Sequence, residues 1–269
     1  MLYICIPVHN ESATVGVLLW RIRKMFQSYS REYEILVFDD ASTDGTAEIL
    51  APYGDVTPLT VIRSQTRKGY AFAVNALARE ASRRTKYPRR DAMIIMQGDF
   101  TDQPENLPEL IKRFEGGADV VIGERGTANE PMEVKRLRQL APWAIRFFVP
   151  VIGIDDPFGS FRLYRISLIR ELLKTYGEKP LVNTDGWAAN VEMLIATLPL
   201  ARRVEKIAVE PRYDLRVRTT RIKPFADSMA LFRFGRSARG SKVAMPPATV
   251  AATSSPAQTP PPTRERATS

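Results

Sequence analysis

The chain has 269 residues, enough for one large domain or two small ones. Hydrophobic residues make up 44% of it and charged residues 26%, a balance that allows a sizeable core in a soluble protein. A single cysteine, Cys5, excludes an intrachain disulfide and favours the reducing cytoplasm. With one histidine as well, the composition argues against a zinc site or a histidine-based triad. The N-terminal residues do not have the pattern of a secretory signal.

The net charge of +9 is concentrated in one stretch, because residues 201–242 hold twelve Lys or Arg against four Asp or Glu. Such a stretch is typical of a protein that binds a partner carrying phosphates, which could be nucleic acid, anionic lipid headgroups or a phosphorylated small substrate. A solvated helix face is the simpler interpretation. We do not expect a nucleic-acid partner, because neither a helix-turn-helix nor an aromatic strand motif accompanies the charge.

Short apolar runs alternate with helical patterns through the first half of the chain. The runs predict strands, and the segments between them have apolar residues at helical spacing. Continuously apolar strands that alternate with amphipathic helices predict an α/β fold with a parallel sheet covered on both faces. Ligands of such sheets bind at the carboxyl ends of the strands. The predicted strands are 2–8, 34–38, 59–63, 91–96 and 118–123, and the helical patterns are 15–26, a segment from 46 onward, 69–84 and 105–115.

Three later segments have a different character. The run "RQLAPWAIRFFVPVIG" (138–153) is apolar and aromatic, but prolines interrupt it and it is too short to span a bilayer. It is expected to lie on a membrane surface, pack on the sheet or line an acceptor groove. Residues 225–236 have apolar side chains at roughly helical spacing and are a further membrane contact candidate. Residues 241–269, rich in Ala, Thr, Ser and Pro, predict a disordered tail.

Polar clusters follow four of the predicted strands. A carboxylate in such a place accepts from a nucleotide base or ribose, or holds a divalent cation on a diphosphate. We expect Asp40 and Asp99 to leave neighbouring strands and point into one crevice. Each cluster alone has a simpler interpretation, such as helix capping by residues 42–44. Neither a GxGxxG nor a P-loop motif follows the first strand. The clusters are "PVHNE" (7–11), "FDDASTDGT" (38–46), "QGDFTDQPE" (97–105) and "GERG" (123–126).

The first three clusters, together with "GSFRLYR" (159–165), closely resemble the family 2 glycosyltransferases with the GT-A fold. The chain is most similar to the dolichol or polyprenyl-phosphate mannosyltransferase and glucosyltransferase branch, over about residues 2–235. The resemblance implies a Rossmann-like nucleotide-diphospho-sugar transferase with a mostly parallel central sheet and helices on both faces. This domain would cover residues 1–240, with a nucleotide-sugar half (1–123) and an acceptor half (124–240).

The resemblance also implies roles for residues in the donor half. Asp40, with Asp39 beside it, matches the carboxylate that reads the base, and Asp99 would bind Mg²⁺ or Mn²⁺ that bridges the donor phosphates. Two residues depart from the family's D-x-D-x-Q pattern, because Gln97 replaces its first Asp and Thr101 its Gln. Gln97 still offers a ligand oxygen, and Asp102 or Glu105 could assist. The remaining matches in this half are Pro7, His9 and Glu11 at the nucleoside, with His9 in place of a Tyr, and Gly98 in the metal loop.

In the acceptor half, Arg125 matches an arginine near the phosphates, and Ser160 and Arg162 belong to a loop beneath the acceptor. Glu192 matches a glutamate ahead of an apolar helix, or else lies on an exposed face. In the basic segment 213–223 the family's Gly-x-Ser is missing, so the choice among its cations stays open. The cations expected at the leaving diphosphate are Arg216, Arg218 and Lys223.

These matches imply an inverting transfer of a hexose from GDP-mannose or UDP-glucose to a polyprenyl or dolichyl phosphate, in a protein peripheral to the cytoplasmic face of an anionic membrane. A lipid phosphate is anionic at neutral pH and needs no strong general base. A sugar hydroxyl would need one, and Asp156 or Glu192 would be the candidates. A transferase with a saccharide or soluble acceptor and a non-catalytic nucleotide-sugar-binding domain are the alternatives.

Overall fold

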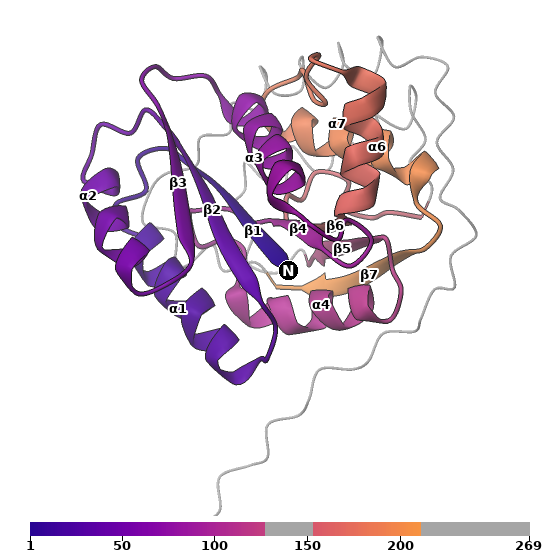
Figure 1. Cartoon of the computed structure of the whole chain (residues 1–269), viewed down its shortest axis with the longest axis horizontal. Coiled ribbons are helices and arrows are strands. Elements are labelled where there is room, and N and C mark those ends of the chain that lie inside the picture. The colour runs from indigo at the N-terminus through magenta and orange to yellow at the C-terminus, as the bar shows by residue number, and fades with distance from the viewer. Residues whose placement is uncertain (127–152, 211–269) are drawn as a thin grey trace, which may run out of the picture.

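The structure is a computed structural model that describes residues 1–126 and 153–210 (Figure 1). The described strands form one sheet in the order β3-β2-β1-β4-β6-β5-β7. All five strands expected from the sequence are present, and β6 and β7 are additional. Their bounds are β1 Leu2–Val8, β2 Tyr33–Asp40, β3 Leu59–Ser64, β4 Ala92–Ile95, β5 Val120–Arg125, β6 Arg162–Arg165 and β7 Val204–Val209.

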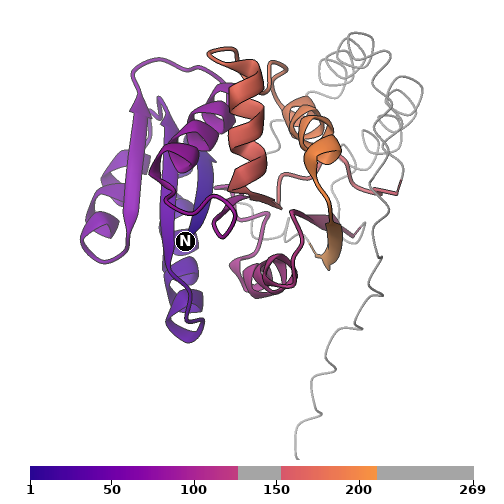
Figure 2. The same cartoon turned by 45° about the vertical axis from the view of Figure 1, so that its right-hand side comes forward.

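Helices cover both faces of this sheet, as expected (Figures 1 and 2). One face packs against α3 (Tyr70–Arg84), α6 (Ile166–Tyr176) and α7 (Trp187–Thr197). The other packs against α1 (Val15–Ser28), α2 (Thr46–Leu50) and α4 (Leu107–Glu115). Short 3-10 turns complete the described elements: η1 (Ala51–Asp55), η2 (Pro104–Asn106) and η3 (Leu198–Leu200).

Apolar spacing explains why these helices dock. In α1 the buried residues recur every three or four positions, which places them in one stripe facing the sheet. Alternate side chains of each central strand supply the two cores, because successive residues of a strand point to opposite faces. Leu36 and Phe38 therefore pack under α3, while Ile35 and Val37 pack under α1.

One feature of the sheet differs from the expectation. The acidic strand ends do not leave neighbouring strands, because β1 lies between β2 and β4. Strand β6 pairs antiparallel with both β4 and β5, so the sheet is mostly parallel, which confirms the fold that the family resemblance implies. Through this pairing one sheet spans the expected boundary between residues 123 and 124, with β5 crossing it.

Several expectations lie outside the described residues. They are the membrane contact at 138–153 apart from its last residue, the basic segment 213–223 with Arg216, Arg218 and Lys223, the segment 225–236 and the tail 241–269. Within residues 1–126 and 153–210, no helix has the length and apolar character needed to cross a bilayer.

Candidate active site

The loops that follow β1 and β2 are joined by polar contacts. Ser12 and Asn10 donate their backbone N–H groups to Asp44 Oδ2 at 3.1 Å and to Ser42 Oγ at 2.9 Å. Glu11 N–H donates to Thr46 Oγ1 at 2.9 Å. Burial alone would raise the pKa of Asp44, but the hydrogen bonds from Thr46 and Ser12 outweigh it and lower that pKa. Side chains of the "FDDASTDGT" run thus hold the backbone of "PVHNE".

Non-glycine residues with left-handed backbone conformations follow three of the strands. Among the described residues these are Asn10 after β1, Ala41 after β2 and Phe100 after β4, with φ values of 51°, 54° and 67°. Such conformations cost of order 1 kcal/mol each and cluster at functional sites. Their positions at the carboxyl ends of adjacent parallel strands mark this edge of the sheet as the candidate site.

Asp40 is buried at this edge, and its carboxylate holds the loop that leads into α3. Its two oxygens accept the backbone N–H groups of Lys68 at 2.6 Å and of Gly69 at 2.9 Å. His9 donates from Nδ1 to the backbone carbonyl of Asp40 at 2.7 Å, which fixes the plane of its imidazole. Asp39 points the other way, accepts from Ser42 N–H at 3.0 Å and lies 3.3 Å from Arg63 Nε.

The loop after β4 contacts the loop after β1 from the opposite side. Thr14 Oγ1 donates to the carbonyl of Gly98 at 2.9 Å. A side-chain carbon at Gly98 would lie 2.8 Å from Val8 Cγ1 and 3.6 Å from Glu11 Cγ, so a larger residue would require Val8 to move. The "PVHNE" loop, which contains Pro7 at the end of β1, therefore lies between the Asp40 loop and the Asp99 loop. Sequence reasoning placed these three clusters together correctly, although it expected direct neighbours.

Asp99 is 4% exposed and is held in a tight turn. Its Oδ1 accepts from the backbone N–H of Thr101 at 3.1 Å and from Thr101 Oγ1 at 2.6 Å. Thr101 is thus a partner of the aspartate, a role that its hydroxyl can fill and that motif matching did not predict.

Asp102 joins the loop after β4 to the acceptor half. Its Oδ1 accepts from Arg125 Nη2 at 2.7 Å, and its Oδ2 accepts from Ser160 Oγ at 3.1 Å and from the backbone N–H of Gln97 at 2.9 Å. Arg125 Nη2 also donates to Ser160 Oγ at 2.9 Å. These contacts engage both oxygens of Asp102, and its expected help in metal binding stays a prediction. Glu105 pairs instead with Arg21 at 3.1 Å.

Arg162 is 1% exposed and is surrounded by backbone carbonyls. Its Nη1 donates to the carbonyl of Asn190 at 2.6 Å, and its Nη2 donates to those of Asp156 and Pro157. Asp156 accepts the N–H groups of Phe158 and Gly159 at 3.2 and 3.1 Å. Arg162 and Asp156 therefore fix the conformation of the loop 156–162, which contains Ser160.

Glu192 lies on α7 and holds the loop before that helix. Its Oε2 accepts the backbone N–H groups of Asn183 and Thr184 at 2.8 and 2.9 Å. In the same loop Asp185 accepts the N–H of Ala71, in the first turn of α3, at 2.9 Å. Asp185 was missed from the sequence, because no local pattern links it to residues 114 positions away.

Tyr70, at the start of α3, makes a second link to α7. It donates its hydroxyl proton to Asn190 Oδ1 at 2.8 Å. Burial first, and then the nearby Asp102 carboxylate, raise the pKa of Tyr70, so its hydroxyl stays protonated at neutral pH. The acceptor-half loops are therefore attached to the donor half through neutral as well as charged groups.

The residues after β4 fit a divalent cation that arrives with a diphosphate. No group of three or more Asp, Glu, His or Cys side chains suited to a metal is found in the described ranges. The donor set at residues 97–99 consists of one carboxylate and one amide oxygen, which are hard ligands. Mg²⁺ is commonly held by one or two carboxylates together with substrate phosphates. Asp99 and Gln97 therefore suit a shared site better than a preformed metal centre.

A mostly parallel α/β sheet with acidic loops at the ends of β1, β2 and β4 defines the class: a GT-A-like nucleotide-diphospho-sugar fold. Comparison with known families agrees. Residues 3–173 match the glycosyl transferase family 2 profile, which is more than half of the chain, and the chain belongs to this family of glycosyltransferases.

Curated relatives have modest identity. A dolichol-phosphate mannosyltransferase of Pyrococcus furiosus is 31% identical over 62% of this chain and 46% of its own length. An undecaprenyl-phosphate mannosyltransferase of Micrococcus luteus is 26% identical over 76% of this chain and 80% of its own. The chain spans 63% of an uncharacterized glycosyltransferase, YkcC, of Bacillus subtilis, at 25% identity over 79% of this chain.

Solved structures show the same fold. Glucosyl-3-phosphoglycerate synthase from Mycobacterium tuberculosis, in complex with Mn²⁺, UDP and glucosyl-3-phosphoglycerate, superposes with a TM-score of 0.59 at 18% identity. The match covers 88% of this chain and 78% of that one. TarS of S. aureus in complex with UDP gives 0.53 at 16% identity, over 87% of this chain and 64% of that one.

Proposed function

We propose that this protein is an inverting glycosyltransferase that moves a hexose from GDP-mannose or UDP-glucose onto a polyprenyl or dolichyl phosphate. The observation that carries the proposal is the meeting of the Asp40 and Asp99 loops on either side of "PVHNE". The names of the two mannosyltransferase relatives support a lipid-phosphate acceptor.

The nucleoside would bind along the ends of β1 and β2. Pro7, His9 and Glu11 would line this pocket, and the imidazole of His9, fixed by Asp40 O, offers a flat surface for a base. Asp40, with Asp39 behind it, would set the geometry of the 65–69 loop through its contacts with Lys68 and Gly69. We therefore assign recognition of the nucleobase to the ends of β1 and β2.

The donor phosphates would lie over the loop after β4. Asp99 and Gln97 would hold Mg²⁺ or Mn²⁺ there, with Gly98 and Thr101 shaping the turn, and the cation would supply positive charge to the leaving diphosphate. The solved fold relatives contain Mn²⁺ or Mg²⁺ together with UDP, which supports this assignment. The cations Arg216, Arg218 and Lys223 would neutralise the same phosphates.

The acceptor would approach from the side of residues 156–162. A phosphate monoester is anionic at neutral pH, so its oxygen attacks without a strong general base, and Arg125 would steer it. Because Arg162 and Glu192 bond backbone groups, we assign both a positioning role in the described loops. A lipid acceptor also implies peripheral contact with an anionic membrane at its cytoplasmic face.

The test is transfer of label from GDP-mannose or UDP-glucose, with Mn²⁺, to undecaprenyl or dolichyl phosphate. Organic-phase label is expected with the wild-type protein. Asp99→Ala should abolish it, and Asp55→Ala, an exposed carboxylate on η1, is the matched control that should retain it.

Two outcomes would contradict the proposal. Label that stays in the aqueous phase on a saccharide or phosphorylated small molecule would assign a soluble acceptor. If the protein binds the donor but neither transfers the sugar to any acceptor nor hydrolyses the donor, it would be a non-catalytic nucleotide-sugar-binding domain.

A further inference from the structure

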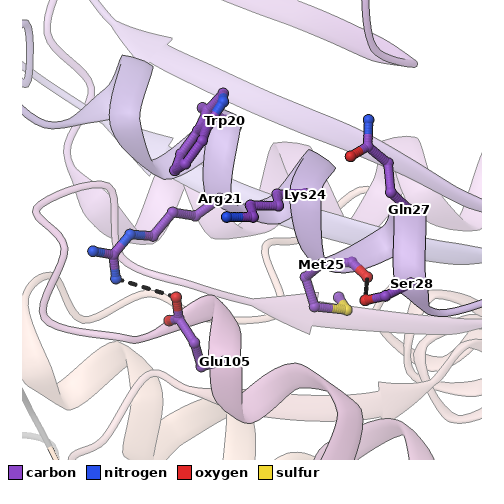
Figure 3. Close-up of a pocket in the computed structure, with 7 residues that line it drawn as sticks. All are labelled: Trp20, Arg21, Lys24, Met25, Gln27, Ser28 and Glu105. Carbon is purple, nitrogen blue, oxygen red and sulfur yellow. Dashed lines mark hydrogen bonds and ion pairs between the residues drawn. The ribbon is translucent and has the colours of Figure 1, made fainter.

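The outer surface of α1 has a pocket that also includes Glu105 of η2 (Figure 3). It is an open depression with a volume of about 740 Å³, and it is lined by Trp20, Arg21, Lys24, Met25, Gln27, Ser28 and Glu105. In Figure 3 the Arg21 side chain leaves α1 toward Glu105, while Lys24 lies beside Trp20. These two cations, three residues apart on one helix, have different partners.

Arg21 contacts the loop after β4 at two places. Its guanidinium lies 4.9 Å from the centre of the Phe100 ring, and its Nη1 lies 3.1 Å from Glu105 Oε1. A guanidinium over an aromatic face within about 6 Å makes a favourable cation–π contact. The Arg21 side chain thus contacts both ends of the segment 100–105.

The residue under the guanidinium has a strained backbone. Phe100 has φ 67°, directly between Asp99 and Thr101, and its side chain is buried. A bulky residue in the left-handed region persists only where its surroundings hold it there. The turn it forms lets Thr101 donate two hydrogen bonds to Asp99 Oδ1.

We propose that Arg21 is a positioning residue for Asp99: by covering Phe100 and pairing with Glu105, it holds the strained turn that presents the carboxylate to the cation and diphosphate. This inference rests on the proposed function for the ligand, but its structural part does not. Helix α1 and the residue that precedes it would act at two points, through Thr14 on Gly98 and through Arg21 on Phe100.

The decisive experiment is residue-resolved hydrogen exchange of the Thr101 amide, since this group bonds Asp99 directly. In Arg21→Ala we expect exchange to be faster by about three- to tenfold, because the variant loses one exposed cation–π contact and one exposed ion pair. Arg21→Lys should recover part of the protection. Lys24→Ala, whose cation lies 5.1 Å from the Trp20 ring, should leave the Thr101 amide unchanged.

A second measurement connects the turn to its ligand. Titration of Mn²⁺ in the presence of UDP or GDP should show a dissociation constant raised by about three- to tenfold in Arg21→Ala and unchanged in Lys24→Ala. Equal Thr101 exchange in wild type and Arg21→Ala would overturn the inference. Wild-type protein that binds no Mn²⁺ with either nucleotide would instead contradict the proposed function, while the exchange result would still decide the role of Arg21.

Discussion

Asp102 and Arg125 form an ion pair of 2.7 Å with side chains that are 2% and 12% exposed, and this pair connects the loop after β4 to the end of β5. Ser160 lies beside it and contacts both partners, so the runs "QGDFTDQPE" (97–105), "GERG" (123–126) and "GSFRLYR" (159–165) meet at one point. The pair fixes the position of Gln97 as well, through the backbone N–H that donates to Asp102.

Asp102→Asn should destabilise the protein more than Ser160→Ala does. Removing one charge of a buried pair leaves the other unpaired and typically costs about 3–5 kcal/mol. Ser160→Ala keeps the ion pair and removes only the hydroxyl between its partners, and a hydrogen bond to a charged group contributes about 1.5–3 kcal/mol. Urea denaturation of both variants measures the difference in the free energy of unfolding. Equal losses would show that Arg125 finds another partner readily.

Asp40→Ala should weaken binding of the donor nucleotide by at least about tenfold. The change removes the carboxylate that holds the Lys68 and Gly69 amides and so frees the loop beside the nucleoside, and a hydrogen bond to a charged group contributes about 1.5–3 kcal/mol. Calorimetric titration with UDP and GDP measures the effect. Nucleotide affinity equal to wild type would remove Asp40 from the base site.

Gly98→Ala should lower both stability and nucleotide-dependent Mn²⁺ affinity. The added methyl group would lie 2.8 Å from Val8 Cγ1, and such overpacking costs about 1–3 kcal/mol. Gly54→Ala is the matched control, because a methyl group there meets nothing within 4 Å. Thermal unfolding and Mn²⁺ titration of both variants test the prediction, and similar behaviour of the two would contradict it.

Asp44→Asn should destabilise the protein at neutral pH and progressively less in acid. The folded-state pKa of Asp44 is lowered from its ordinary value of 3.8, so its ionised form stabilises the fold above 3.8. That contribution is lost as pH falls through the lowered value. The difference in melting temperature between wild type and variant, followed from pH 7 downward, should therefore shrink. A constant difference would mean that the asparagine fails for steric reasons.

Much of the fold could be predicted from local patterns. The five apolar runs and the spacing of buried residues in α1 are local signals, because burial on both faces requires continuous apolar strands and one-sided burial requires helical spacing. The polar residues at the ends of β1, β2 and β4 follow from the same patterns, since the carboxyl ends of parallel strands share one edge.

The sequence by itself thus determined the α/β class, the order of its first five strands along the chain and the edge where the acidic residues meet. Only the tertiary structure decided that β1 separates Asp40 from Asp99, that β6 inserts antiparallel between β4 and β5, and that Asp102 pairs with Arg125. The contact of Asp185 with the first turn of α3 and that of Arg21 with the Phe100 ring belong with these. The physical reason is that apolar periodicity fixes which face of an element is buried, whereas strand neighbours and ion-pair partners are chosen by packing between segments distant along the chain.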